Sequence, residues 1–155
     1  MKLEKSREEL LKAWLHKYGI QFNDLELFNL ALTHPSWQKD IDNNNERLAF
    51  LGDAVLDLFF AEMLYIEFPE KDKGSLTEMR KDKVKREFLA KIGKLKKIED
   101  IIQMRGVRND GLQKVIGEAI EAVIGALFLD KGWQNTNLIL KSFFGGNDFS
   151  DLFID

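Results

Sequence analysis

Apolar residues recur at spacings of three and four along most of the chain, and few stretches alternate with a period of two. This periodicity is typical of amphipathic helices, so the sequence predicts an all-α protein. Pro35, Pro69, Gly19 and Gly132 stand where helices are expected to end, because proline interrupts a helix and glycine often follows one. The helices are expected at about residues 6–18, 24–32, 45–68, 75–93, 98–104, 110–131 and 135–144.

The two most apolar of these helices carry acidic residues. The helix expected at 45–68 is apolar on nearly every side from Leu48 onward, and such a helix is buried. Buried carboxylates are costly unless they are paired, protonated or bound to a metal. Their spacing places the acids of each helix near one stripe or face. The acids are Glu46, Asp53 and Asp57 in this helix and Glu118 and Glu121 in the helix at 110–131.

Two interpretations of these acids remain open. In the first, cations such as Arg47 and Lys114 form a structural ion-pair network with them. In the second, the two helices pack side by side, so that Asp53, Glu118 and Glu121 converge on Mg²⁺, which prefers oxygen ligands. The small residues that would permit such close packing are Gly52, Ala54, Gly117 and Ala119.

Length and composition narrow the class of protein. A chain of 155 residues with 45% hydrophobic residues suits one domain with a substantial core. The absence of cysteine excludes a disulfide scaffold and thiolate chemistry, and two histidines 18 residues apart cannot form a histidine-rich zinc site. The sequence shows neither a signal peptide nor a membrane span, so a cytoplasmic protein without membrane contact is expected.

Charge is distributed unevenly along the chain. Residues 71–97 hold eleven basic and four acidic residues, although the whole chain has a net charge of −3. The rest of the chain therefore carries −10. A basic segment on an acidic protein is either a solvated helix face or a surface for a polyanion, and the sequence leaves both readings open.

Three ordered motifs resemble those of the ribonuclease III family. Residues 45–56 read NERLAFLGDAVL and match eleven of the twelve residues in the family's signature helix, NERLEFLGDAVL. Residues 32–36, LTHPS, are similar to its LTH-x-S element. Residues 117–130, GEAIEAVIGALFLD, are similar to its late acidic helix. The resemblance covers about residues 30–132 and identifies the chain as a member of this family.

The resemblance implies a helical homodimer that hydrolyses double-stranded RNA with Mg²⁺, for which Mn²⁺ can substitute, leaving 5′-phosphates and short 3′ overhangs. It makes Asp53, Glu118 and Glu121 metal ligands, with Asp53 and Glu121 the catalytic residues. The family's fourth acid falls on Ala49, and Glu46 is a supporting acid one turn earlier. The departure at Ala49 leaves an alternative function, that of an impaired relative which binds structured RNA as a scaffold.

Further expectations concern partners and domain limits. Phe50 is expected to enter a pocket of a partner subunit, the alternative being an ordinary core residue. The catalytic domain is expected at residues 1–145 and a tail at 146–155, without the separate RNA-binding domain that many relatives carry. Duplex RNA is recognised largely through its backbone, so basic side chains are the candidate contacts. They are Lys81, Lys83, Lys85 and Arg86.

Overall fold

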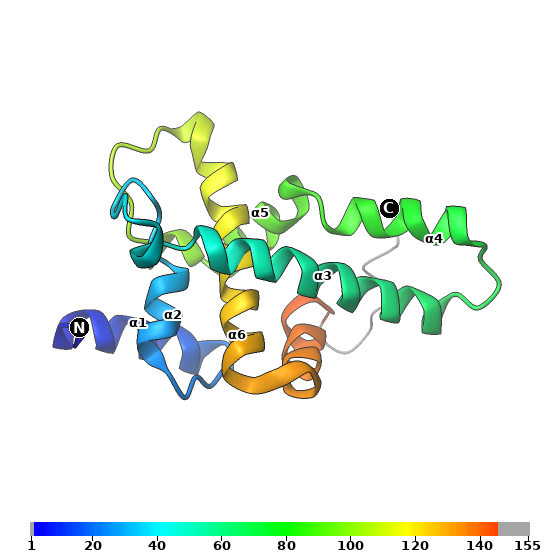
Figure 1. Cartoon of the computed structure of the whole chain (residues 1–155), viewed down its shortest axis with the longest axis horizontal. Coiled ribbons are helices and arrows are strands. Elements are labelled where there is room, and N and C mark those ends of the chain that lie inside the picture. Colours follow the sequence, from blue (N-terminus) through cyan, green and yellow to red (C-terminus); the bar gives the residue numbers. More distant parts are fainter. Residues whose placement is uncertain (1, 146–155) are drawn as a thin grey trace.

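The computed structural model describes residues 2–145 as a helical domain (Figure 1). The predicted all-α class is confirmed, because the one β pairing among these residues is an isolated bridge between Thr33 and Gln103. The predicted tail at 146–155 lies outside the described residues. The helices are α1 (Lys5–Lys17), α2 (Leu25–Ala31), α3 (Glu46–Glu67), α4 (Lys73–Lys83), α5 (Arg86–Leu95) and α6 (Asn109–Gly145), with 3-10 turns η1 (Ile41–Asn43) and η2 (Ile98–Asp100).

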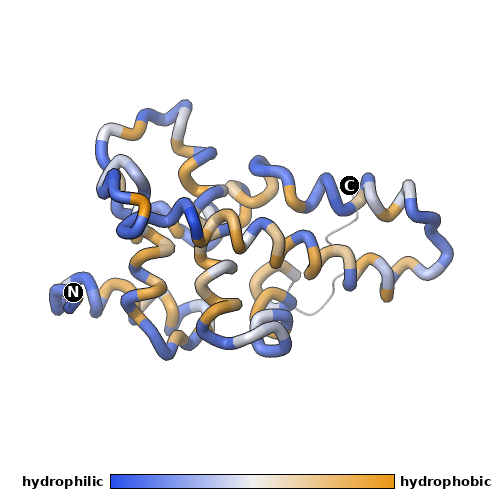
Figure 2. The backbone as a smooth tube through the Cα atoms, in the orientation of Figure 1, coloured by the Kyte–Doolittle hydropathy of each residue, from blue (hydrophilic) through white to orange (hydrophobic). Residues whose placement is uncertain are grey.

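Helices α3 and α6 form the central pair, and apolar segments face each other where they cross (Figures 1 and 2). Leu56 and Phe60 of α3 and Ile116 and Ile120 of α6 are fully buried in the common core. The burial of such large side chains supplies most of the free energy that holds the two helices together. The acids predicted on these helices therefore stand on one rigid packing unit.

Glycines bring the backbones of α3 and α6 into contact. A Cβ atom at Gly52 would overlap the carbonyl oxygen of Glu121 and lie 2.9 Å from the backbone nitrogen of Gly125. Gly52 was among the small residues predicted to allow this approach, but its partner is Gly125. Two of the other predicted positions do not take part, since Ala54 is exposed and Gly117 faces α5.

A sharp bend divides α6 at Gly132. This glycine has φ +77°, a backbone conformation that other residues rarely adopt, and the predicted helix stop there is confirmed. The chain after the bend turns back toward α3 (Figure 1). Phe144 then packs within 6.1 Å, between ring centroids, of Phe60 and Phe88. The last turns of α6 thereby cover the outer part of α3 and the start of α5.

The basic region departs from the single helix predicted at 75–93. It forms two helices, α4 and α5, with an extended residue at Lys85 between them. The reason is visible in the apolar spacing, which jumps by five between Met79 and Val84 and would turn the apolar side of one continuous helix away from the core. The helix also begins earlier than predicted, because the side chain of Asp72, and not that of Ser75, accepts the capping hydrogen bond.

Loops hold the beginning of α3 in place. The side-chain Nδ2 of Asn45 donates a hydrogen bond to the carbonyl oxygen of Ala31 at 3.1 Å, and the backbone nitrogen of Asn45 donates to Thr33 at 2.9 Å. The backbone nitrogen of His34 donates to Gln103 at 3.0 Å. This pairing explains why the helix predicted at 98–104 is reduced to the turn η2. Within residues 2–145, none of the helices has the length and apolar character that a membrane span requires.

Candidate active site

A hollow of about 390 Å³ opens where the first half of α3 meets α5 and the middle of α6. Four of the predicted acids line it, two from each central helix. Asp53 and Glu121 stand beside the glycine crossing, so the same close packing that joins the helices brings their carboxylates together. The complete lining is Asn45, Glu46, Ala49, Phe50, Asp53, Arg86, Glu118 and Glu121.

The fifth acid, Asp57, does not line this hollow. It lies one turn beyond Asp53, where its Oδ1 is 3.7 Å from Nε of Arg80 on α4. Its charge still acts on the site, because burial and the nearby charge of Asp57 raise the pKa of Asp53 above its ordinary value. Asp57 therefore links α3 to α4 and adds to the negative potential without facing the hollow.

Glu121 has the most strongly perturbed acidity in the site. Its pKa is raised from 4.5 to about 7, mainly by burial and also by the charges of Asp53 and Glu118, while Arg86 acts in the opposite direction. A shift of this kind is expected when a carboxylate loses water and faces like charges. Strongly perturbed carboxylates in a hollow are typical of functional sites.

The ion-pair interpretation accounts for two of the five predicted acids, Asp57 with Arg80 and Glu118 with Lys114. Nζ of Lys114 lies 4.0 Å from Glu118, at the outer limit for an ion pair. Arg47 contacts Asp42 at 3.8 Å and not the acids of the hollow. In the described part of the chain, Asp53 and Glu121 have no cation within 4.0 Å. Their charges are thus left available to a ligand.

The donor set suits a hard divalent cation. Carboxylate oxygens are the ligands that Mg²⁺ prefers, and a cation would relieve the repulsion that raises the pKa of Glu121. Among residues 2–145, no three His, Asp or Glu side chains are arranged closely enough to enclose an ion. Like charges are expected to hold the side chains apart in this way. The suitability of the site for Mg²⁺ therefore rests on the oxygen ligands that the acids supply and on their lining one hollow.

Ala49 forms part of the wall of the hollow and is largely buried. It lies between Glu46 and Asp53 on the same side of α3, where the resemblance places the family's fourth carboxylate. A longer acidic side chain at this position would enter the hollow. The departure from the family pattern thus falls on the inner surface of the site.

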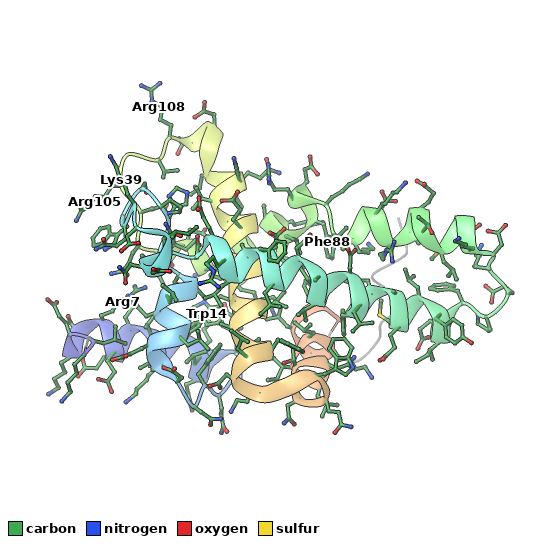
Figure 3. All side chains as sticks on the ribbon, viewed as in Figure 1. Arg7, Trp14, Lys39, Phe88, Arg105 and Arg108 are labelled. Carbon is green, nitrogen blue, oxygen red and sulfur yellow. The ribbon has the colours of Figure 1, made fainter. Side chains whose placement is uncertain are left out.

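The predicted basic contacts are divided by the break between α4 and α5. Nζ of Lys81 pairs with Glu78 at 3.0 Å, and Nζ of Lys85 pairs with Asp82 at 2.7 Å. The ammonium group of Lys83 lies 4.8 Å from the ring centroid of Phe88, which Figure 3 labels. Arg86 alone of the four lines the acidic hollow. Sequence reasoning named Arg86 but gave no sign of this placement.

Phe50 is not a core residue, because 84% of its surface is exposed. It borders a second hollow of about 670 Å³ on the outer side of α3, whose lining is mainly apolar. Phe50 thus projects beside an open apolar depression instead of filling the interior. The apolar residues around it are Leu27, Leu30, Ile41, Leu48, Leu51 and Leu129.

His34 stands near the acids in a defined tautomer. Its Nδ1 accepts a hydrogen bond from the backbone nitrogen of Ser36 at 3.0 Å, which requires Nδ1 to be unprotonated. Burial lowers the pKa of His34, while the charges of Glu118 and Glu46 oppose that shift. His34 therefore acts here as a structural hydrogen-bonding residue just after the end of α2.

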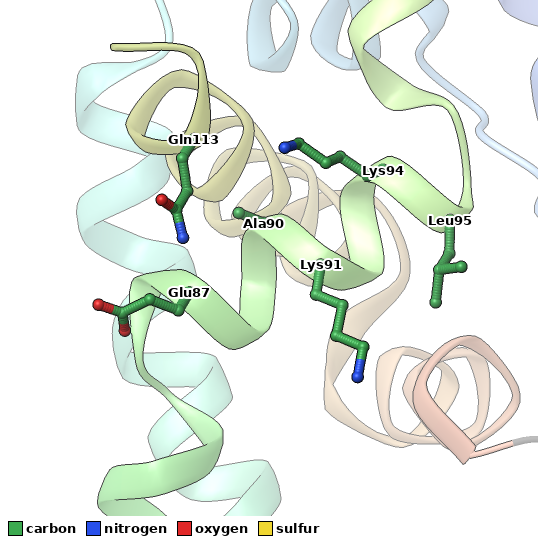
Figure 4. Close-up of a pocket in the computed structure, with 6 residues that line it drawn as sticks. All are labelled: Glu87, Ala90, Lys91, Lys94, Leu95 and Gln113. Atoms are coloured by element: carbon green, nitrogen blue, oxygen red, sulfur yellow. The ribbon is translucent and has the colours of Figure 1, made fainter. Parts of the chain in front are cut away.

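A further hollow of about 390 Å³ lies between α5 and the start of α6 (Figure 4). Lys91 and Lys94 stand on its α5 side and Gln113 on its α6 side, and Glu87 is its one acid. The residues that line it do not include a group of acids comparable to the four in the first hollow. The acid-lined hollow is therefore the better candidate for chemistry.

These features define an all-helical domain with a carboxylate site between its two central helices. Residues 24–145 match the family model described as ribonuclease-III-like, and the chain belongs to this family. It is 34% identical over 160 residues to ribonuclease 3 of Borreliella burgdorferi, covering 94% of this chain and 65% of that protein. It is 37% identical over 145 residues to ribonuclease 3 of Streptococcus pyogenes serotype M5, covering 88% and 62%.

Solved structures show the same fold. The nuclease domain of ribonuclease III from Campylobacter jejuni matches with a TM-score of 0.79 and 34% identity, over 86% of this chain and 94% of that one. Giardia Dicer matches with a TM-score of 0.71 and 22% identity over 91% of this chain and 20% of Dicer, a likeness that concerns the fold alone. The chain spans 62–65% of the length of the two bacterial ribonucleases compared above.

Proposed function

We propose that this domain is an endoribonuclease that hydrolyses phosphodiester bonds of double-stranded RNA with Mg²⁺, leaving 5′-phosphates and short 3′ overhangs. The observation that supports it most is the convergence of Asp53, Glu118 and Glu121 on one hollow in a member of the ribonuclease-III-like family. The lack of cysteine suits a reducing compartment, and the cytoplasm is the proposed location.

Asp53, Glu118 and Glu121 are the proposed ligands of Mg²⁺, with Mn²⁺ as a substitute. The ion, when bound, would lower the pKa of an attacking water and neutralise charge on the phosphate. Asp53 and Glu121 are the proposed catalytic residues because Gly52, which directly precedes Asp53, packs against the backbone of Glu121 and so fixes the backbone positions of both residues. Glu46 is a supporting acid that adds negative potential at the edge of the hollow.

The proposed RNA contacts extend from the hollow along α4. Lys81, Lys83 and Lys85 occupy the end of that helix and the break after it. The ion pairs of Lys81 and Lys85 are exposed, so they are weak and can exchange an acidic partner for a phosphate. RNA binding through such contacts is expected to weaken steeply with salt.

A second copy of the chain is the proposed partner at the outer side of α3. The Campylobacter jejuni nuclease domain has a region involved in dimer formation. The exposed ring of Phe50 and the apolar depression beside it are the features on this chain that suit a symmetric, self-complementary contact. In such a dimer, each subunit would cut one strand of a duplex lying across both sites.

Replacing Phe50 with Asp is expected to weaken self-association, because it removes a large apolar anchor and adds a charge to an apolar contact. The dissociation constant of the dimer should rise by about 30-fold or more, as for loss of a central anchor. Sedimentation velocity over a concentration series measures this change. Leu95→Asp is the control, since Leu95 on α5 is also exposed, at 68%, but lies outside the apolar depression. Equal association of both variants would contradict the proposed interface.

Replacing Ala49 with Glu tests the function together with its scaffold alternative. The new carboxylate would enter the hollow and add a ligand, so half-maximal cleavage of a long RNA duplex should need roughly 10-fold less Mg²⁺. Ala54→Glu is the control, because it adds the same charge at an exposed position of α3 that does not line the hollow.

The unsubstituted protein decides between the two functions in the same Mg²⁺ series. Cleavage of the duplex supports the enzyme. Binding without cleavage at any Mg²⁺ concentration, with cleavage restored by Ala49→Glu, supports an RNA-binding scaffold that has lost activity. Absence of duplex binding at low salt would contradict both.

A further inference from the structure

Arg86 differs from Lys81, Lys83 and Lys85 because its side chain lines the acidic hollow and theirs do not. It is the first residue of α5, directly after the extended residue Lys85. The interruption between α4 and α5 turns Arg86 toward α6, whereas Lys81 and Lys85 form ion pairs with acids of α4. Figure 1 shows α5 passing behind α3, next to α6.

Gly117 is what allows Arg86 to approach α6. A Cβ atom at Gly117 would lie 3.0 Å from Cγ and 3.4 Å from the carbonyl oxygen of Arg86. Any side chain at this position would therefore press on the stem of the arginine. Gly117 directly precedes Glu118, so Arg86 packs against α6 next to one of the proposed metal ligands.

Arg86 is the one cation among the residues that line the acidic hollow, beside four acids. In the described part of the chain it has no carboxylate within 4.0 Å. Its charge nevertheless reaches the site, because it lowers the pKa of Glu121. A guanidinium group that is held near acids without pairing with them keeps its hydrogen-bond donors available to another anion.

We propose that Arg86 is a catalytic residue that binds the non-bridging oxygens of the RNA phosphate being cleaved. This proposal rests on the proposed nuclease function and gives a role within the site to a residue that was expected only to contact the RNA backbone. A guanidinium group fits a phosphate because it can donate two parallel hydrogen bonds. In the RNA-free protein, the same charge opposes the binding of a divalent cation by the acids.

Arg86→Gln separates these two effects. With a duplex substrate at saturating Mg²⁺, kcat should fall by about 10-fold or more, because the group that neutralises phosphate charge is lost. In the absence of RNA, Mn²⁺ measured by calorimetry should bind about 3-fold more tightly, because a positive charge has left the hollow. A merely structural role of Arg86 would not increase metal affinity.

Arg86→Lys distinguishes charge from geometry. Lysine restores the positive charge but not the two parallel donors, so Mn²⁺ affinity should return to that of the unsubstituted protein while kcat recovers only in part. Lys91→Gln is the matched control on the same helix, because Lys91 does not line the acidic hollow. This variant should leave both kcat and Mn²⁺ affinity unchanged.

The outcomes for Arg86 and for the proposed function can be told apart. Cleavage by the unsubstituted protein, together with Arg86→Gln behaving like Lys91→Gln in kcat and Mn²⁺ affinity, would overturn the role of Arg86 alone. A change confined to KM would also overturn it, because that result describes a contact remote from the reacting phosphate. Failure of the unsubstituted protein to cleave any duplex with Mg²⁺ or Mn²⁺ would overturn both proposals.

Discussion

Replacing Glu121 with Gln is expected to reduce cleavage of double-stranded RNA while making the metal-free protein more stable. The amide keeps the size of the side chain but removes the charge that would hold Mg²⁺. Cleavage should fall by roughly 10²- to 10³-fold, the scale seen when one group that stabilises transition-state charge is lost. The initial rate of cleavage, measured at saturating Mg²⁺, checks this expectation.

The stability gain follows from the pKa of the same carboxylate. Because the pKa of Glu121 rises from 4.5 to about 7 on folding, the folded state binds its proton more tightly than the unfolded state does. The stabilisation is present below pH 4.5 and is lost as the pH rises through 7. Discounted for solvent screening, the ionised side chain costs about 1 kcal/mol at pH 8, which corresponds to a Tm about 2–4 °C higher for Glu121→Gln.

Thermal unfolding in a metal chelator measures this difference. The gain of Glu121→Gln over the unsubstituted protein should be clear at pH 8 and absent near pH 4. Glu67→Gln is the control, because Glu67 is exposed at the far end of α3 and does not line the hollow. A Glu121→Gln variant that unfolds at a lower temperature at pH 8, or that cleaves as fast as the control, would show that Glu121 is a structural residue.

The sequence was informative wherever a helix must bury an apolar surface. The apolar residues of α3 and α6 predicted both helices, Pro69 predicted the C-terminal end of α3, and Gly132 predicted the bend in α6. An acid in such an apolar helix must occupy a position where its carboxylate reaches water or a partner, because a buried unpaired charge is costly. For this reason five acids could be named as one group before their positions were known. Four of them, Glu46, Asp53, Glu118 and Glu121, line the hollow, whereas Asp57 faces Arg80.

The sequence was less informative about contacts between segments that are distant in the chain. Gly125 looked like an ordinary residue of an apolar helix, and only the crossing angle of α3 and α6 makes it the partner of Gly52. The placement of Arg86 depends on the break after α4 and on the space above Gly117. Neither the spacing of residues nor local helix preference contains this information, because both features arise from tertiary packing.

Replacing Gly52 with Ala is expected to destabilise the fold more than any other substitution considered for this protein. The added Cβ atom would overlap the carbonyl oxygen of Glu121 and lie 2.6 Å from its carbonyl carbon. These are backbone atoms, so no side-chain rotation can relieve the overlap and the two central helices must separate. Overpacking of a core commonly costs about 1–3 kcal/mol, and a clash with backbone should exceed about 3 kcal/mol.

Urea unfolding followed by circular dichroism measures this loss of unfolding free energy. In thermal unfolding, the same loss should lower Tm by about 10 °C. Gly111→Ala is the matched control on α6, where an added Cβ atom would meet only Cγ1 of Val107, at 4.0 Å. That variant should be neutral or slightly more stable, because alanine favours a helix over glycine. Since Gly52 directly precedes Asp53, separation of the helices would also move Asp53 away from Glu121. Any folded Gly52→Ala protein should therefore need more Mg²⁺ for cleavage, whereas equal stability of the two alanine variants would contradict the backbone contact at this crossing.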